Sequence, residues 1–258
     1  MTVTKRFLSD EDAASMLALS KDADSVELKL TVPASDHQAT IAALEMDALD
    51  SQIRQVYFFE TPELSLSTNG VVVRGRRVQG RGDDTVVKLR PVTPSELPGR
   101  LRKLPELVVE VDAMPGGYVC SASLKGSARA DVRHVASARL APRKLFTKAQ
   151  REFYAQHAPD GVTLDDLSIF GPIFVLKLKL VPKHFGRKLV AEMWLYPDGS
   201  RILELSTKCA PHEAFQVAAE LRAVLTERGV NLDGEQETKT RKALLYFAER
   251  AQVTMTPA

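Results

Sequence analysis

Polar and apolar side chains alternate strictly in the stretch SVELKL, residues 25–30. Successive side chains of a β-strand point to opposite faces, so this alternation predicts a strand with one apolar and one polar face. The polar face, which carries Glu27 and Lys29, could meet bulk water or line the inside of a barrel. The pattern of this stretch alone leaves both arrangements open.

Similar alternation, or a run of β-branched and aromatic residues, predicts seven further strands. They are IRQVYFFET, NGVVVRGRR, DDTVVKLRPV, ELVVEVDAM, PIFVLKLKLVP, KLVAEMWLY and RILELSTK. Helical patterns cover residues 9–20, SDHQATIAALEMDALD, TKAQREFYAQHA, PHEAFQVAAELRAVLTERG and QETKTRKALLYFAERA. The Gly-, Ser-, Ala- and Arg-rich stretch from Pro115 to about Arg143 has no clear pattern. We therefore expect one α+β domain over 1–258, with about eight hairpin-connected, antiparallel strands.

Six of the predicted strands carry charged residues two or four positions apart, which places each set on one face of its strand. These sets are Glu27 and Lys29, Arg74 and Arg76, Lys88 and Arg90, Glu110 and Asp112, Lys177 and Lys179, and Glu204 and Lys208. An antiparallel sheet with one face in water gives the same pattern. A barrel interior is favoured by the near absence of uncharged polar residues, by the separation of cations and anions between strands, and by a strand number that suits a closed barrel.

The charges themselves indicate what such an interior would hold. Buried lysine and arginine side chains are costly unless they are paired or bind a ligand, so this many cations require a highly anionic guest. The carboxylates among them indicate a divalent cation, because Mg²⁺ is usually held by one or two carboxylates together with phosphate oxygens. A phosphate chain with a metal ion satisfies both requirements.

The amino-acid composition says more about the cellular environment of the protein than about its function. The chain has 258 residues, 44% hydrophobic content and a net charge of +2, as in ordinary globular proteins, so nucleic acid is not an expected partner. It contains no apolar run approaching the roughly 20 residues that span a bilayer, so we expect no membrane association. Cys120 and Cys209 lie far apart without metal-type spacing. A reduced, cytoplasmic setting is the simplest expectation.

The order of these residues resembles the CYTH superfamily, also called triphosphate tunnel metalloenzymes. The family's opening E-x-E-x-K is similar to Ser25-x-Glu27-x-Lys29, and its Tyr-Phe-Asp-Thr-Pro stretch is similar to YFFETPEL from Tyr57. Its R-x-R strand matches Arg74-x-Arg76. Its late E-x-E reads Glu204-x-Ser206. The resemblance runs from about residue 24 to 248 and also includes Lys88, Glu110, Asp112, Lys177, Lys179, Glu192 and Lys239.

The resemblance implies an eight-stranded antiparallel β-tunnel and a Mg²⁺ or Mn²⁺ cofactor. Family members include thiamine triphosphatases, inorganic triphosphatases, class IV adenylyl cyclases and fungal RNA triphosphatases. It further implies that Glu192 orients or activates water, and that metal is held by Glu27 and Glu204, with Glu110 and Asp112 as helpers. The implied substrate contacts are Lys29, Arg74, Arg76, Lys88, Arg90, Lys177, Lys179, Lys208 and Lys239.

Two departures from the family pattern leave the function open. Ser25 and Ser206 each replace a carboxylate, which weakens the implied metal site. The range 115–170 has no family equivalent and could cap the tunnel or contact a protein partner. One hypothesis is a metal-dependent triphosphatase acting on inorganic triphosphate or on a nucleoside or other organic triphosphate. The alternative is a non-catalytic protein that binds a phosphate chain, such as a nucleotide or polyphosphate.

Overall fold

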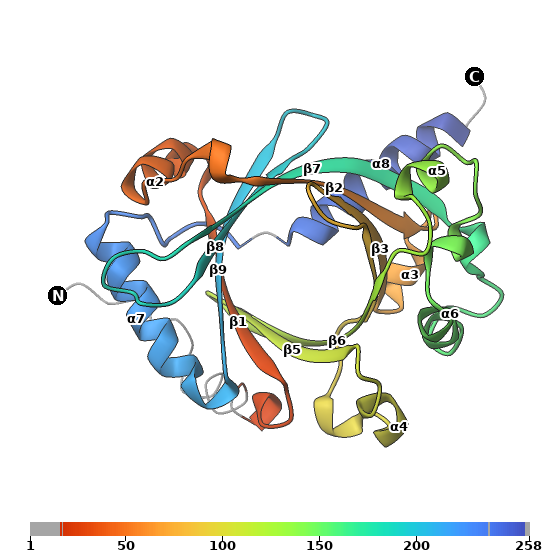
Figure 1. Cartoon of the computed structure of the whole chain (residues 1–258), viewed down its shortest axis with the longest axis horizontal. Helices are drawn as coiled ribbons and strands as arrows, with labels where there is room; N and C mark the ends of the chain where they lie inside the picture. The colour runs from red at the N-terminus through yellow and green to blue at the C-terminus, as the bar shows by residue number, and fades with distance from the viewer. Residues whose placement is uncertain (1–15, 17, 237, 256–258) are drawn as a thin grey trace.

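The computed structural model describes residue 16, residues 18–236 and residues 238–255. The helix expected over residues 9–20 therefore lies mostly outside the described residues. Among those residues, no helix is both long and apolar enough to cross a membrane. The described residues are organised around a single β-barrel, which Figure 1 views along its opening.

Nine strands, counted within the described residues, form one closed barrel in the order β1-β5-β6-β4-β3-β2-β7-β8-β9. Every neighbouring pair is antiparallel except β1 and β5, which run parallel. The strands are β1 (Ser25–Val32), β2 (Gln52–Glu60), β3 (Val71–Val78), β4 (Asp84–Leu89), β5 (Leu107–Met114), β6 (Gly117–Ser127), β7 (Ser168–Leu180), β8 (Leu189–Leu195) and β9 (Arg201–Cys209).

The expectation of a closed barrel is confirmed, but the expectation of eight antiparallel strands is wrong. The additional strand is β6, which lies between β5 and β4 and was hidden in a stretch of small residues. Its Ser121 is paired with Glu110 and its Ser123 with Lys88. Small side chains on β6 thus stand beside large charged ones, so this strand has few of the bulky apolar residues by which strands are usually recognised.

Helices and short 3-10 turns flank the barrel. The helices are α2 (His37–Ala43), α3 (Ser65–Thr68), α4 (Gly99–Arg102), α5 (Val132–Ala136), α6 (Lys148–Ala155), α7 (Ala214–Glu227) and α8 (Lys239–Met255). The 3-10 turns are η1 (Ala34–Asp36), η2 (Ala48–Asp50), η3 (Pro94–Glu96), η4 (Pro142–Leu145), η5 (Leu164–Asp166) and η6 (Pro211–Glu213). The range 115–170 contains β6, α5, η4, α6, η5 and the first residues of β7, and α6 contacts β4 and β6.

Apolar side chains form two cores, one outside the barrel and one inside it. The outer core joins outward-facing strand residues such as Leu28 and Leu205 to the buried face of α7. The second core joins the inward-facing Phe58 and Trp194 to Leu244 of α8. The helix α8 contacts β7, behind which it passes in Figure 1, and its Leu244 lines the barrel cavity.

Candidate functional site

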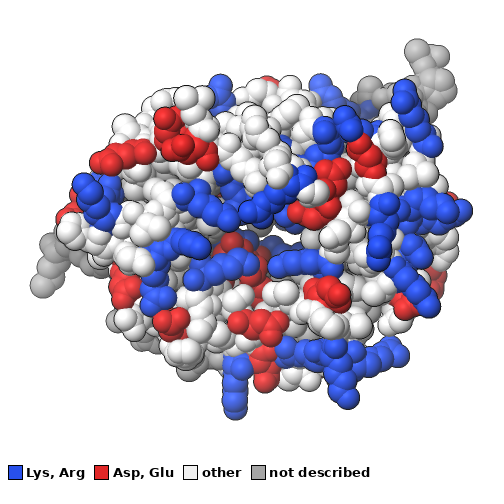
Figure 2. Space-filling view, viewed as in Figure 1, with Lys and Arg blue, Asp and Glu red and all other residues white. Residues whose placement is uncertain are grey.

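The barrel encloses a cavity of about 690 Å³ to which all nine described strands contribute side chains. Its opening is visible at the centre of Figure 2, ringed by lysine, arginine and carboxylate side chains. Glu27 and Lys29 of β1 both line this cavity. The polar face of the first strand therefore points into the barrel, and a sheet with its charged face in water is excluded.

The residues predicted from the sequence converge on this cavity. Asp112 is fully buried and pairs with Lys29 and Arg90, which both line the cavity. The other predicted site residues line the cavity itself, and they are Glu27, Lys29, Arg74, Arg76, Lys88, Arg90, Glu110, Lys177, Lys179, Glu192, Glu204, Lys208 and Lys239.

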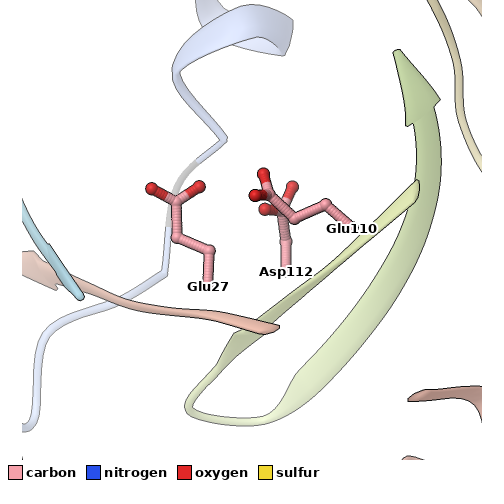
Figure 3. A group of neighbouring side chains, drawn as sticks. All are labelled: Glu27, Glu110 and Asp112. Atoms are coloured by element: carbon pink, nitrogen blue, oxygen red, sulfur yellow. The ribbon is translucent and has the colours of Figure 1, made fainter. Parts of the chain in front are cut away.

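Glu27, Glu110 and Asp112 form the first of two carboxylate groups in the site (Figure 3). One carboxylate oxygen from each residue lies within 4.8 Å of the others. The parallel pairing of β1 with β5 explains this, because it places Glu27 opposite Asp112 and Ser25 opposite Glu110. Three carboxylates at this spacing offer the oxygen ligands that Mg²⁺ and Mn²⁺ prefer.

Cations neutralise this first group. Lys29 Nζ lies 2.8 Å from Asp112 Oδ1 and 3.1 Å from Glu27 Oε2. Arg90 Nη1 lies 2.9 Å from Asp112 Oδ2, and Lys208 Nζ contacts Glu110. Burial alone would raise the pKa of Asp112, but the opposing charges, Lys29 first, hold that pKa at about 2. Burial likewise opposes the charge of Lys29, yet Asp112 and Glu27 raise its pKa above the usual value.

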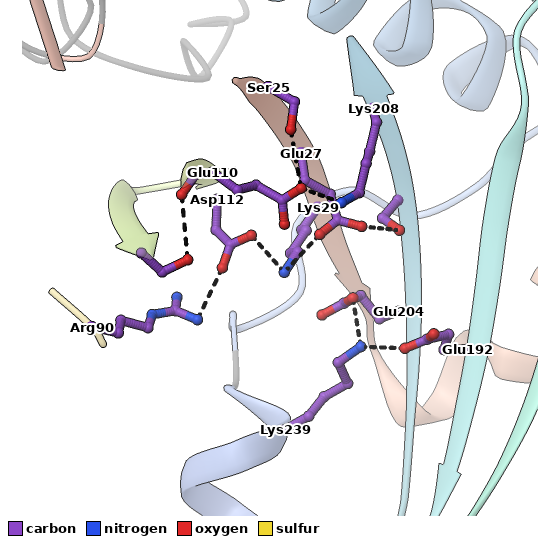
Figure 4. Close-up of polar contacts among 12 residues, drawn as sticks. Ser25, Glu27, Lys29, Arg90, Glu110, Asp112, Glu192, Glu204, Lys208 and Lys239 are labelled. Carbon is purple, nitrogen blue, oxygen red and sulfur yellow. Dashed lines mark hydrogen bonds and ion pairs between the residues drawn. The ribbon is translucent and has the colours of Figure 1, made fainter. Parts of the chain in front are cut away.

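Glu192 and Glu204 form the second carboxylate group, at neighbouring positions of β8 and β9. Lys239 Nζ lies 2.7 Å from Glu192 Oε2 and 2.7 Å from Glu204 Oε1 (Figure 4). Lys177 Nζ donates to Glu192 Oε1 at 2.9 Å, and Trp194 Nε1 donates to Glu192 Oε2 at 3.3 Å. Glu204 thus shares Lys239 with Glu192. From the sequence, Glu204 had been expected to bind metal together with Glu27.

Ser25 and Ser206 lie beside the first carboxylate group. Ser25 Oγ donates to Glu110 Oε2 at 3.1 Å, and Ser206 Oγ donates to Glu27 Oε1 at 3.3 Å. Each serine therefore stands where a longer acidic side chain would add an oxygen next to this group. Hydroxyl donors at these places hold the existing carboxylates by hydrogen bonds but add no negative charge.

Other cavity cations have little or no carboxylate compensation. Arg74 forms no ion pair within the described residues, and its buried Nε has no hydrogen-bond partner there. Burial, followed by the like charge of Arg76, lowers the pKa of Arg74 to about 10. Burial lowers the pKa of Lys88 to about 8, because its nearest carboxylate oxygen, on Asp112, is 3.9 Å away. The strands β3 and β4 thus present positive charge suited to an anion.

Three cations that line the cavity were not predicted from the sequence: Arg54 of β2, Lys125 of β6 and Arg241 of α8. Arg54 is bound through its Nε and Nη2 to Gln52 Oε1, at 3.1 and 2.7 Å. It shares its face of β2 with Val56 and Phe58, so the strand showed one charge in an apolar row. Lys125 belongs to the unrecognised β6. The period-2 spacing from Phe58 back to Arg54 was the available signal for the first of them.

Comparison by sequence finds no matching family model and no matching curated protein. By structure, the chain is similar to a candidate adenylate cyclase from Bacillus halodurans, with a TM-score of 0.57, 13% identity and coverage of 85% of this chain and 97% of that one. It is also similar to HpAC1 from Hippeastrum, a candidate adenylyl cyclase with a dominant triphosphatase activity, with a TM-score of 0.56, 19% identity and coverage of 83% and 92%. The chain therefore has the CYTH-like tunnel fold, in a divergent form.

Proposed function

We propose that the protein is a divalent-cation-dependent triphosphatase that binds a phosphate chain inside the barrel. The observation that carries the proposal is the presence of two complementary features in one cavity. Arg74 and Lys88 supply poorly compensated positive charge, and Glu27, Glu110 and Asp112 supply a compact group of carboxylates. A chain of phosphates needs the first kind of charge, and a divalent metal ion would need the carboxylates.

The first carboxylate group fits a Mg²⁺ or Mn²⁺ ion by its donor chemistry. Three oxygens from Glu27, Glu110 and Asp112 lie close together, and the group carries three carboxylate charges. When bound, such an ion would neutralise negative charge that develops on the phosphate oxygens. Lys208, with a side chain 49% exposed, could leave Glu110 for solvent as an ion enters.

The remaining tunnel residues would bind and orient the chain. Arg74 and Arg76 can donate several hydrogen bonds to phosphate oxygens, and Lys88 adds a charge-assisted donor. Glu192 has its pKa held well below the usual value: burial opposes this, but Lys239 and Lys177 outweigh it. A carboxylate with so low a pKa accepts a proton poorly, so its role would be to orient groups by hydrogen bonds. Inorganic triphosphate and organic triphosphates both satisfy these contacts.

Phosphate release by the purified protein tests the proposal. Inorganic triphosphate and ATP would each be supplied with Mg²⁺, Mn²⁺ or EDTA, and Arg74→Met and Glu27→Gln would be compared with the wild type. We expect release that requires metal and falls at least tenfold in both variants. The exposed Arg133→Ala change, which lies outside the cavity, is the matched control. Release that persists in EDTA would contradict a metal-dependent reaction.

A second function, binding without turnover, is favoured by the charge balance of the carboxylates. Glu27, Glu110, Asp112, Glu192 and Glu204 each lie within ion-pair distance of a lysine or arginine. Ser25 and Ser206 add no ligand charge. A protein whose carboxylates are all paired in this way could bind a phosphate chain with its cations alone. Thermal stabilisation by triphosphate that is independent of metal, without phosphate release, would identify this function.

A further inference from the structure

Lys239 is held closely between two carboxylates of the tunnel wall. Its ammonium group lies 2.7 Å from a carboxylate oxygen of Glu192 and 2.7 Å from one of Glu204, and both contacts have hydrogen-bond geometry. The Trp194 ring covers it, with 5.0 Å between the ring centroid and Nζ. The side chains of Lys239, Glu192 and Glu204 are only 13%, 15% and 10% exposed.

The backbone of α8 fixes the position of this ammonium group. Lys239 is the first residue of α8, and its carbonyl oxygen accepts a hydrogen bond of 3.0 Å from Tyr196 Oη on the barrel wall. One turn later, Ala243 and Leu244 are buried in the inner apolar core. The helix thus anchors Lys239 by contacts that do not involve its charge.

The second carboxylate group is also balanced without any added ion. Glu192 and Glu204 contribute two negative charges, Lys239 and Lys177 contribute two positive charges at hydrogen-bond distance, and Arg54 Nη1 lies 4.0 Å from Glu192 Oε1. A divalent cation placed between these carboxylates would meet the ammonium group of Lys239 in a poorly solvated space. Bringing another cation into such a space is strongly unfavourable unless Lys239 leaves.

The first carboxylate group differs in having an exposed partner. Lys29 and Arg90 hold the buried Asp112 at 2.8 and 2.9 Å. Lys208, which pairs with Glu110, is half exposed. A metal ion or a phosphate chain could therefore rearrange the partners of this group, whereas the Lys239 pair has no exposed member.

We infer that Lys239 is a built-in cation that permanently fills the place between Glu192 and Glu204, and so removes both carboxylates from the metal-binding residues. This inference rests on the proposed function for its metal site at Glu27, Glu110 and Asp112, and it deepens that function. Glu192 and Glu204 are then positioning residues: they hold α8 across one end of the tunnel. The phosphate chain is then bound by the cations of β3 and β4.

The number of Mn²⁺ ions bound per chain tests this role of Lys239 without any substrate. It is measured from the loss of the electron paramagnetic resonance signal of free Mn²⁺. We expect Lys239→Met to bind one more Mn²⁺ per chain than the wild type, because the emptied carboxylate pair becomes a site. Adding Glu204→Gln to Lys239→Met should remove that extra ion. Lys179→Met, which removes a tunnel lysine that the structure leaves without an ion pair among the described residues, should bind as many ions as the wild type.

A second variant keeps the test decisive if Lys239→Met does not fold. Glu204→Gln alone retains the shape of the side chain and an oxygen acceptor for Lys239, and we expect it to bind as many Mn²⁺ ions as the wild type. Loss of an ion in Glu204→Gln, or an unchanged count in folded Lys239→Met, would overturn the inference. A wild type that binds no Mn²⁺, beside a Lys239→Met variant that binds one, would support the role of Lys239 and contradict the metal site of the proposed function.

Discussion

Arg74 and Arg76 point into the cavity from the same face of β3, yet Arg76 has a carboxylate partner and Arg74 has none among the described residues. Arg76 Nη2 lies 2.7 Å from Asp84 Oδ2, and its Nε donates to the same carboxylate. The buried Nε of Arg74 donates to no described acceptor. A guanidinium whose buried Nε has no acceptor is costly in the free protein, and a phosphate oxygen would supply that acceptor.

Arg74→Met should therefore separate ligand binding from stability. We expect triphosphate affinity to fall by about 10- to 100-fold, the range for losing hydrogen bonds to a charged group. The melting temperature of the ligand-free protein should stay the same or rise, because an uncompensated charge is removed. Differential scanning fluorimetry with and without triphosphate measures both quantities. Arg76→Met is the matched comparison, and it should lower the ligand-free melting temperature because Asp84 loses its partner.

Lys88 should make phosphate binding depend on pH. Burial lowers the pKa of Lys88 to about 8 in the free protein, so the side chain is charged below pH 8 and becomes neutral as the pH rises through that value. A bound anion favours the charged form, so affinity for triphosphate should fall above pH 8 and binding should take up protons there. Titration calorimetry between pH 7 and 9.5 in buffers of different ionisation enthalpy measures this. In Lys88→Arg the decline should be much smaller, and an identical decline in both proteins would contradict the assignment.

The inner face of the barrel could be predicted from the sequence because a tunnel wall imposes a two-residue period on charge. Glu27 and Lys29, like Arg74 and Arg76, alternate with apolar residues that pack outside. This is also why Arg54 was missed: the two-residue period of its strand continues inward with the apolar Val56 and Phe58, so the period carried only one charge.

The pairing of the charges could not be predicted, because it depends on strand register. The register of β8 and β9 places Glu204 beside Glu192, and the start of α8 then brings Lys239 between them. The family resemblance had implied that Glu204 belongs to the same metal site as Glu27. Likewise, the parallel contact of β1 with β5, which brings Glu27 opposite Asp112, leaves no local signal in either strand. The strand β6 was missed for a related reason. Its Ser121 and Ser123 lie opposite Glu110 and Lys88 on other strands, and the sequence does not show that pairing.

Glu60 should stabilise the turn that carries part of the tunnel lining. Its fully buried carboxylate accepts hydrogen bonds from the backbone N–H groups of Thr61, Leu66 and Ser67, at 2.8, 2.9 and 2.8 Å. Ser67 lines the cavity from α3. Glu60→Ala leaves three N–H groups without this acceptor, and we expect the free energy of unfolding to fall by roughly 1–3 kcal/mol or more. Urea denaturation measures it. Glu63→Ala, an exposed change in the same turn, should have little effect, and equal losses in the two variants would contradict the role of Glu60.

Restoring the missing carboxylates should strengthen metal binding at the first group. Ser25 and Ser206 already contact Glu110 and Glu27 through their hydroxyl groups, so glutamates at these positions would place added negative charge beside the same oxygens. We expect the double variant Ser25→Glu, Ser206→Glu to bind Mn²⁺ at least tenfold more tightly, because affinity for hard cations rises with the number of charged oxygen ligands. Titration calorimetry with Mn²⁺ measures the affinity.

The matched control for this variant is Ser25→Ala, Ser206→Ala, which removes the hydroxyl donors without adding charge. It should leave Mn²⁺ affinity within a few-fold of the wild type, since a single neutral hydrogen bond contributes only about 1 kcal/mol. If the glutamate variant binds Mn²⁺ no better than the alanine variant, Glu27, Glu110 and Asp112 are not the metal ligands. If it binds metal tightly and also gains phosphate release that the wild type lacks, the native protein is a receptor whose catalytic site was lost at these two serines.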